Sequence, residues 1–204
     1  MTVTALIVAA GRGTRAGGSV AKQWQPLAGA RVIDHTLRAF ADHPQVDNIV
    51  LVLHADDMDK AFAFQSTLGA VCVRGGAERA ASVRAGLQAV PTGCTQVLIH
   101  DVARPCIDAQ TISAVLRTLD TSPGAAPALA VTDALWTGAE GRVTGTQDRT
   151  ALYRAQTPQG FDFDSIKAAH DAYDTSLPAA DDVAVARAAG LAVAIVSGHE
   201  DNLK

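Results

Sequence analysis

Short runs of apolar residues alternate with segments of helical periodicity along most of the chain. Strands are predicted where the apolar run is too short for a helix and is bounded by turn residues, at about 6–10, 48–53, 71–73, 97–99 and 192–196. Helices are predicted where apolar positions recur every three or four residues, at about 32–40, 56–68, 78–90, 109–119, 163–173 and 182–189, with Asp56 as a possible cap. This alternation predicts an α/β fold, with a mostly parallel, Rossmann-like sheet covered by helices on both faces.

The alternation breaks between about 133 and 150. Glycines at 138, 141 and 145 punctuate a polar, β-like stretch there that has no helical period. Its apolar positions, which include Leu135, Trp136 and Val143, favour a β-hairpin arm over a disordered insertion. We therefore expect a single domain over residues 1–204 with a protruding arm at about 133–150.

The glycine-rich loop after the first predicted strand suggests an anion-binding site. Gly11 and Gly13 allow the backbone to turn tightly and to approach a ligand, and consecutive N–H groups in such a loop can hold a phosphate. Two cations, Arg15 and Lys22, follow closely. A plain turn is an equally good explanation of the glycine pair taken alone.

Two common nucleotide-binding patterns are absent from this loop. The dinucleotide fingerprint fails because Ala16 stands at its third glycine, and because the second predicted strand ends in Leu53 and His54 without an acidic residue. The P-loop pattern fails because no Gly-Lys-Ser/Thr follows at its spacing.

Three later loops carry further candidate residues, and ligands of parallel sheets bind in such loops at the carboxyl ends of strands. The third strand leads into Gly75-Gly76-Ala77-Glu78-Arg79, with Ser82 in the next helical turn, and the fourth leads into His100-Asp101-Val102-Ala103-Arg104-Pro105. Arg149 and Thr157 are candidate phosphate contacts in the third loop region. The structural alternatives are a plain turn before a helix for the first of these loops, a structural Asp–Arg pair for the second and ordinary turn residues for the third.

Composition narrows the class of protein. The chain has 204 residues, of which 48% are hydrophobic and 4% aromatic, and a formal net charge of −4. These values suit one Ala/Val/Leu-rich α/β domain and argue against nucleic acid as a partner. The three cysteines lack metal-site spacing and predict a reduced, cytoplasmic compartment. No apolar run has the length that would predict a membrane partner.

The motifs in their order and spacing resemble the 2-C-methyl-D-erythritol 4-phosphate cytidylyltransferase family. The resemblance covers the chain end to end and rests on 9–15, Lys22-Gln23, 75–83, 100–105, 157–159 and Asp201-Asn202-Leu203-Lys204. It implies a nucleotide-diphospho-sugar transferase type of fold and a CTP-dependent nucleotidyltransferase of non-mevalonate isoprenoid biosynthesis. That enzyme transfers CMP from CTP to 2-C-methyl-D-erythritol 4-phosphate and releases pyrophosphate. Mg2+ or another divalent cation, held mainly by the phosphates, is the implied cofactor.

The resemblance also implies roles for individual residues. Arg15, Lys22 and Lys204 would be catalytic cations around the triphosphate. Asp101 would contact both the ribose and the acceptor alcohol. The implied nucleotide-binding residues are Ala9, Ala10, Gly11, Gly13, Gly76, Ser82 and Asp101, and the implied acceptor-binding residues are Asp101, Arg104, Arg149 and Thr157. In the family's dimer the arm reaches the neighbouring subunit, so a homodimer through the arm is expected here.

The chain departs from the family pattern in the arm and at its end. Ala134 and Trp136 stand where the family usually has a threonine and a lysine, which puts one acceptor contact in doubt. The closing helix that follows the terminal motif in the family is missing after Lys204. We therefore expect a longer chain, which could be fused to 2-C-methyl-D-erythritol 2,4-cyclodiphosphate synthase. The alternative functions are another sugar-phosphate nucleotidyltransferase of the same fold and a non-catalytic nucleotide-binding regulator.

Overall fold

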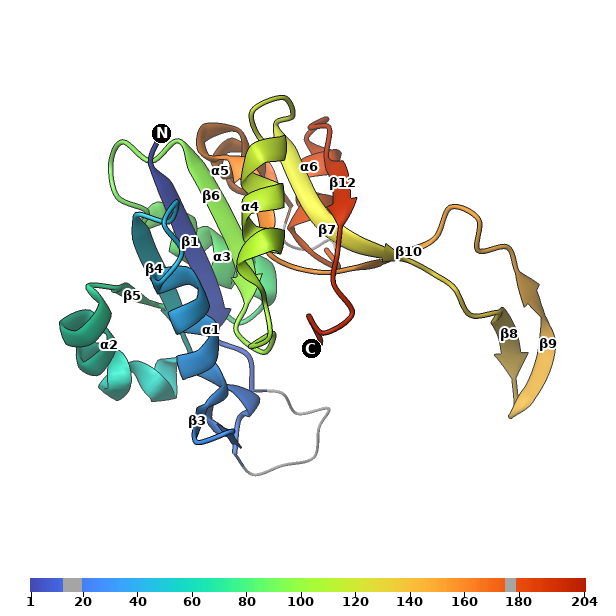
Figure 1. Ribbon diagram of the computed structural model, residues 1–204, viewed down its shortest axis with the longest axis horizontal. Coiled ribbons are helices and arrows are strands. Elements are labelled where there is room, and N and C mark those ends of the chain that lie inside the picture. Colours follow the sequence, from blue (N-terminus) through green and yellow to red (C-terminus); the bar gives the residue numbers. More distant parts are fainter. Residues whose placement is uncertain (13–19, 175–178) are drawn as a thin grey trace.

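An eight-stranded sheet forms the centre of the molecule (Figure 1). The computed structural model describes residues 1–12, 20–174 and 179–204. The strands run in the order β10-β7-β11-β6-β1-β4-β5, and β12 pairs with β7. Their bounds are β1 Val3–Ala9, β4 Asn48–Leu53, β5 Val71–Arg74, β6 Gln96–Asp101, β7 Gly124–Ala130, β10 Tyr153–Ala155, β11 Gln159–Asp162 and β12 Ala194–Ser197.

The sheet is mostly parallel, as predicted. β1 lies parallel to both β4 and β6, β5 continues parallel to β4, and β12 is parallel to β7. β11 runs antiparallel between β6 and β7, and β10 is antiparallel to β7. The chain passes from β1 to β4 and β5 on one side and returns to β6 on the other, so the strand order reverses between β1 and β6.

Helices cover both faces of the sheet (Figure 1). One apolar cluster joins α1, α2 and α4 to one face, and a second joins α3, α5 and α6 to the other. The bounds are α1 Val32–Ala41, α2 Ala61–Leu68, α3 Arg79–Gln88, α4 Ala109–Thr118, α5 Phe163–Ala172 and α6 Asp182–Ala188. Within β1, Ala5 and Ile7 belong to the first cluster and Leu6 to the second. Burial on both faces explains the continuous apolar run of this strand.

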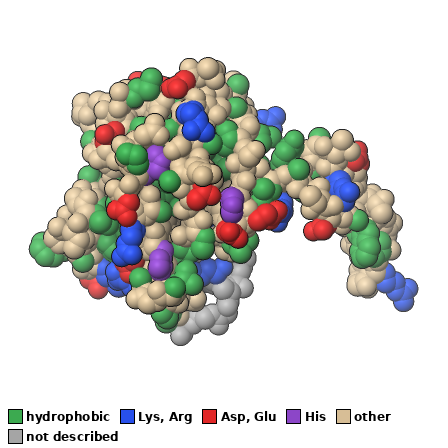
Figure 2. All heavy atoms as spheres, in the orientation of Figure 1, with side chains coloured by type: hydrophobic (Ala, Val, Ile, Leu, Met, Phe, Trp, Pro, Cys, Tyr) green, Lys and Arg blue, Asp and Glu red, His purple; other side chains and the backbone are tan. Residues whose placement is uncertain are grey.

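The predicted arm is a separate two-stranded hairpin. Strands β8 (Leu135–Ala139) and β9 (Arg142–Gln147) pair with each other and with no other described strand. Figure 2 shows the arm standing away from the body of the molecule. Trp136 and Val143 are 68% and 57% exposed, so the arm's apolar side chains have little to pack against within this chain.

Three strands of the central sheet, the short hairpin of β2 (Pro26–Leu27) and β3 (Ala30–Arg31), and one cap differ from the sequence-based expectations. Strands β7, β10 and β11 were not predicted, because Gly124, Pro127 and Gly160 weaken their strand signals and neighbouring strands supply the hydrogen bonds. The expectation that Asp56 caps a helix is wrong. The backbone N–H of Asp56 instead donates to the His54 ring, which caps the 3-10 helix η3 (Ala55–Lys60) before α2.

Candidate active site

The main cavity lies where the strand order reverses, at the carboxyl ends of β1, β5 and β6. Its volume is about 550 Å³, within the range of small-molecule sites. Parallel sheets bind ligands at such a reversal because the loops after the two central strands diverge there. The lining comprises Val8, Ala10, Gly11, Lys22, Gln23, Gly76, Ala77, Glu78, Arg79, Ser82, Asp101, Val102, Ala103 and Lys204.

Small residues form one wall of the cavity, where the loop after β5 crosses the end of β1. A Cβ atom built on Gly75 would lie 2.5 Å from the Ala10 Cβ and 2.9 Å from the Ser82 Oγ. A Cβ on Gly76 would lie 2.5 Å from the Ala81 Cβ. Only glycine allows this close approach without movement of the backbone. The adjacent glycines therefore set the width of the cavity at this wall.

The hydroxyl of Ser82 is already oriented by its own loop. Its Oγ donates to the Glu78 carbonyl at 3.0 Å, with the Gly76 carbonyl 3.4 Å away. With the hydroxyl hydrogen used in this way, the lone pairs of the oxygen remain free to accept a hydrogen bond. The wall therefore presents acceptors to a ligand.

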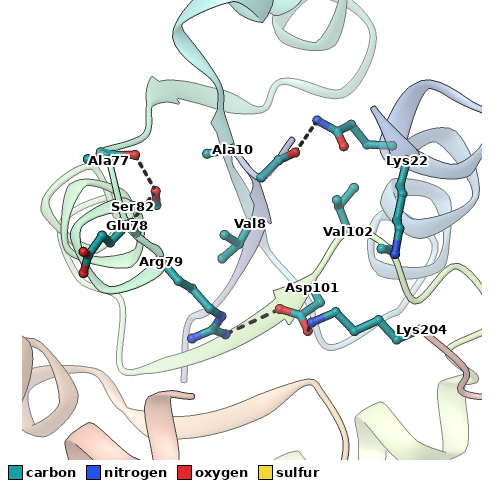
Figure 3. Close-up of a pocket in the computed structure, with 14 residues that line it drawn as sticks. Val8, Ala10, Lys22, Ala77, Glu78, Arg79, Ser82, Asp101, Val102 and Lys204 are labelled. Atoms are coloured by element: carbon teal, nitrogen blue, oxygen red, sulfur yellow. Dashed lines mark hydrogen bonds and ion pairs between the residues drawn. The ribbon is translucent and has the colours of Figure 1, made fainter. Parts of the chain in front are cut away.

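Positive side chains from several sides approach the region around the Asp101 carboxylate, which we call the positive wall of the cavity (Figure 3). Lys204 Nζ lies 2.7 Å from Asp101 Oδ2, and Arg79 Nη2 lies 3.5 Å from Asp101 Oδ1. In Figure 3 the side chain of Lys22 enters the same cavity from the side opposite to Arg79. Around this part of the cavity the four cations Lys22, Arg79, Arg104 and Lys204 outnumber the three carboxylates Glu78, Asp101 and Asp182, which suits an anionic ligand.

Asp101 stays ionised because of these cations. Burial alone would raise its pKa, but the charges of Arg79 and Lys204 outweigh burial and keep the pKa below its ordinary value. Arg79 is held from the other side by Asp182, whose Oδ2 lies 2.7 Å from Arg79 Nη2. Burial would also lower the pKa of Arg79, but the charge of Asp182 raises it above its ordinary value.

Gln23 and Arg79 were not predicted to have a role, although both stand inside motifs of the family resemblance. The Gln23 carboxamide is buried and donates to the carbonyls of Ala9 at 3.0 Å and Gly11 at 3.1 Å. It thereby fixes the base of the glycine loop beside Lys22, its neighbour in the 3-10 helix η2 (Lys22–Trp24). The adjacency of Gln23 to Lys22 was the available signal.

The structure brings together seven of the predicted residues at the cavity: Ala10, Gly11, Lys22, Gly76, Ser82, Asp101 and Lys204. Gly13 and Arg15 lie outside the described residues. Ala9 is fully buried beneath the cavity and contributes its carbonyl to Gln23. Arg149 lies at the root of the arm, where its guanidinium donates to the Thr132 carbonyl.

The remaining predicted residues, Arg104 and Thr157, are engaged inside the chain. The Arg104 guanidinium donates to the Asn202 carbonyl at 2.7 Å, and its side chain is 12% exposed. Thr157 is 4% exposed, and its hydroxyl contacts the His100 Nδ1 at 2.9 Å and the Asp101 N–H at 3.2 Å. This hydroxyl is buried and supports the Asp101 backbone, and the phosphate contact of Thr157 stays a prediction.

His100, next to Asp101, is a neutral structural residue. It is fully buried, and burial lowers its pKa to about 4. Its Nε2 lies 3.2 Å from the Arg104 carbonyl, which can only accept, so the hydrogen is on Nε2. Nδ1 therefore accepts from the Thr157 hydroxyl, which in turn accepts from the Asp101 N–H. This hydrogen-bonded chain fixes the end of β6.

No three His, Cys, Asp or Glu side chains come together in the described part of the chain in a way that could hold a metal ion. Asp101 is the carboxylate at the positive wall, and an oxygen ligand of this kind is compatible with Mg2+. None of the described helices combines the length and apolar character needed to cross a bilayer.

Comparison with known proteins finds the same family across the whole chain. The profile of the 2-C-methyl-D-erythritol 4-phosphate cytidylyltransferase family matches residues 3–204. A protein of that name from Cereibacter sphaeroides is 58% identical over 207 residues, which cover 100% of this chain and 91% of the relative. A bifunctional IspD/IspF enzyme from Ruegeria pomeroyi is 62% identical, and this chain spans 53% of its length.

Solved structures agree with the sequence relatives. The crystal structure of the 2-C-methyl-D-erythritol 4-phosphate cytidylyltransferase from Thermus thermophilus superposes with a TM-score of 0.85 at 33% identity, covering 100% of this chain and 92% of that one. The superposition spans the whole of this chain, and so takes in the strands around the cavity as well as the arm. The chain therefore belongs to the 2-C-methyl-D-erythritol 4-phosphate cytidylyltransferase family, whose members are nucleotidyltransferases.

Proposed function

We propose that this chain transfers CMP from CTP to 2-C-methyl-D-erythritol 4-phosphate and releases pyrophosphate. An oxygen of the acceptor's phosphate attacks the α-phosphorus of CTP, the new P–O bond forms, and the bond to the β-phosphate breaks. The second pKa of a phosphate monoester is about 6, so the attacking group is already largely dianionic at neutral pH. The reaction therefore requires positioning and charge neutralisation more than a general base.

The positive wall supplies the neutralisation in this proposal. Lys22 and Lys204 line the same cavity and can contact phosphate oxygens with their ammonium groups. Arg15 is assigned to the same set by its place in the glycine loop. The N–H groups of the loop that begins at Gly11 would bind the phosphates as hydrogen-bond donors.

The small-residue wall supplies base selection. Ala10 and Gly76 leave room for a flat pyrimidine edge, and Ser82 Oγ and the Gly76 carbonyl offer hydrogen-bond acceptors. Cytosine presents an amino donor where uracil presents a carbonyl. CTP therefore fits this wall better than UTP does.

Asp101 is assigned to the hydroxyl groups of the ribose and the acceptor. Its largely buried, ionised carboxylate lies between the two walls and is a strong hydrogen-bond acceptor. We assign Mg2+ as the cofactor, with the phosphates as its main ligands and Asp101 as the nearby carboxylate. When bound, such a cation neutralises charge on the phosphate oxygens.

A homodimer through the arm is the assembly that we propose. The arm leaves the body with Trp136 and Val143 exposed, and Arg149 at its root lies outside the cavity lining of its own chain. A second copy would cover these apolar side chains and would bring Arg149 to a neighbouring acceptor site. We place this dimer in the cytoplasm, where reduced cysteines are the rule.

The placement of Lys22, Asp101 and Lys204 in one cavity carries the proposal. Pyrophosphate release should be measured with each of the four nucleoside triphosphates, with and without the methylerythritol phosphate. We expect rapid release with CTP only, and only when the acceptor is present. Equal turnover of UTP and CTP would contradict the roles of Gly76 and Ser82. Turnover with a different sugar phosphate alone would favour the alternative of another nucleotidyltransferase.

A further inference from the structure

Gln156 binds the backbone of the chain's last described segment. This residue lies between β10 and β11 and is 5% exposed. Its Nε2 donates to the His199 carbonyl at 2.8 Å, and its Oε1 accepts from the His199 N–H at 3.1 Å. The carboxamide therefore pairs with both backbone groups of one residue. The segment passes close to this carboxamide: a Cβ atom built on Gly198 would lie 2.5 Å from the Gln156 Oε1.

Asn202 is the second attachment of this segment. It is fully buried, whereas Asp201 and Leu203 on either side of it are exposed. Its Nδ2 donates to the Thr157 carbonyl at 2.9 Å. Its own carbonyl accepts from the Arg104 guanidinium at 2.7 Å, and the same guanidinium lies 3.4 Å from the Ala155 carbonyl. Arg104 thus joins the loop after β6 to two segments that are distant in sequence.

These contacts hold the backbone just before Lys204. Lys204 follows Asn202 by two residues, and its side chain is 54% exposed and forms an ion pair with Asp101. A lysine side chain loses considerable rotamer entropy when it is ordered. A half-exposed contact with Asp101 offsets little of this cost, so the position of the ammonium group depends on where the backbone is held.

We propose that Gln156, Asn202 and Arg104 are positioning residues that hold Lys204 in the cavity, and this inference rests on the proposed function. We call these three residues the Gln156 cluster. The proposal adds a role to the one expected of Arg104. Its guanidinium contacts the backbone carbonyls of Asn202 and Ala155, and its Nε lies 3.9 Å from Asp101 Oδ2, so it joins the segment before Lys204 to the carboxylate of the cavity.

A double-mutant cycle in the full-length protein tests the inference. Gln156→Glu is nearly isosteric, but it cannot donate to the His199 carbonyl and sets an anionic oxygen against it. We expect kcat to fall about tenfold to a hundredfold, as misplaced catalytic groups typically cause, with the KM for CTP changed less than about twofold. In a Lys204→Ala background the same substitution should lower kcat by less than about twofold, because the group that it positions is absent.

Arg104→Lys provides an independent second variant that keeps the charge but not the planar fork, and it should show the same dependence on Lys204. Glu200→Gln is the matched control. Glu200 lies in the same segment as His199 and Asn202, and the substitution removes only its exposed ion pair with Arg154, so kcat should stay unchanged. Thermal unfolding of each variant shows whether the fold is retained. Equal losses of kcat with and without Lys204, or an unchanged kcat in a folded Gln156→Glu protein, would overturn the inference. Absence of turnover in the unsubstituted protein would overturn the proposed function, and this inference with it.

Discussion

Asp101 is the residue around which the charges of the cavity are arranged. Arg79 and Lys204 contact its carboxylate, and Lys22 enters the cavity nearby. Arg79 differs from the two lysines because the buried Asp182 already pairs with it. Lys204 can therefore turn from Asp101 toward a bound phosphate chain, and Lys22 lines the same cavity.

Lys22→Ala should lower kcat by about 10²–10³, the usual loss for one preorganised charge partner of a transition state. The effect should fall mainly on kcat, since charge builds up on the phosphate oxygens as the reaction proceeds. Steady-state kinetics with both substrates varied measures this. Arg15→Ala should have the same effect. Lys167→Ala is the control, because Lys167 forms only an exposed ion pair with Asp171 on α5. A change confined to the KM for CTP would make Lys22 a binding group.

His100 should make the stability of the protein depend on pH between 7 and 5. Its pKa is lowered to about 4 by burial, whereas an unfolded histidine has a pKa of about 6.5. The folded state thus binds fewer protons than the unfolded state in this window. The contribution is fully present above pH 6.5 and is lost as pH falls toward 4, which gives a fall of about 2 kcal/mol in the free energy of unfolding from pH 7 to pH 5.

Urea unfolding of the wild type and of His100→Gln at these two pH values measures this share. Gln can still offer one donor and one acceptor to Arg104 and Thr157, but it does not titrate. We expect a smaller fall from pH 7 to pH 5 in the variant, whatever its absolute stability. An identical fall in both proteins would assign the pH dependence to other groups.

At the scale of elements, the site is made where three strand ends meet. The loop after β5 lies against the end of β1, and the loop after β6 carries Asp101. The close contact between the loop after β5 and the end of β1 needs a glycine at position 75. A Cβ atom on Gly11, by contrast, would meet no described atom within 4 Å. The two glycines therefore serve different purposes, packing in one case and access for a ligand in the other.

Gly75→Ala should lower the free energy of unfolding by about 1–3 kcal/mol, the typical cost of overpacking. Gly11→Ala should change it by no more than about 0.5 kcal/mol, as for a residue without neighbours. It should nevertheless raise the KM for CTP, because the added methyl group obstructs the approach of the phosphates. Denaturant unfolding and kinetics of both variants separate these effects. A large loss of stability in Gly11→Ala would indicate a structural role for that glycine.

At the scale of the whole molecule, the body and the arm have different relations to the cavity. The body supplies all of the described lining residues, whereas the arm extends away from it (Figure 2). An arm whose apolar side chains are exposed gains stability by packing on a partner. The proposed dimer would make each site depend on residues from both copies.

Mixing two inactive variants tests this shared site. Lys22→Ala and Arg149→Ala chains should be inactive alone. In a mixed dimer, one of the two sites regains its own Lys22 and the partner subunit's Arg149. Random exchange between the two variants should therefore restore about a quarter of the wild-type activity, given two-fold symmetry. Demonstrated heterodimers that remain inactive would show that Arg149 serves its own chain.

Local sequence was sufficient to predict the strands that are long apolar runs and the helices whose apolar positions recur regularly. The apolar runs of β1, β4 and β6 and the periodic positions of α1 and α4 predicted those elements closely. The hairpin between β8 and β9 was likewise visible in its glycines and in its apolar positions. The motifs also indicated Lys22, Asp101 and Lys204, because their charged or polar side chains stand at strand ends or in the terminal motif.

Tertiary structure alone decided the rest, because hydrogen bonds between distant residues have no local signal. Lys204 meets Asp101 across 103 positions of sequence, and Thr157 turns inward to support Asp101 across 56. Arg104 has the charge expected of a substrate contact, and its neighbours in space are the backbone carbonyls of Ala155 and Asn202 as well as the carboxylate of Asp101. Sequence determined which chemical groups the site could contain. Burial and long-range packing determined which of them face the cavity and which hold the others in place.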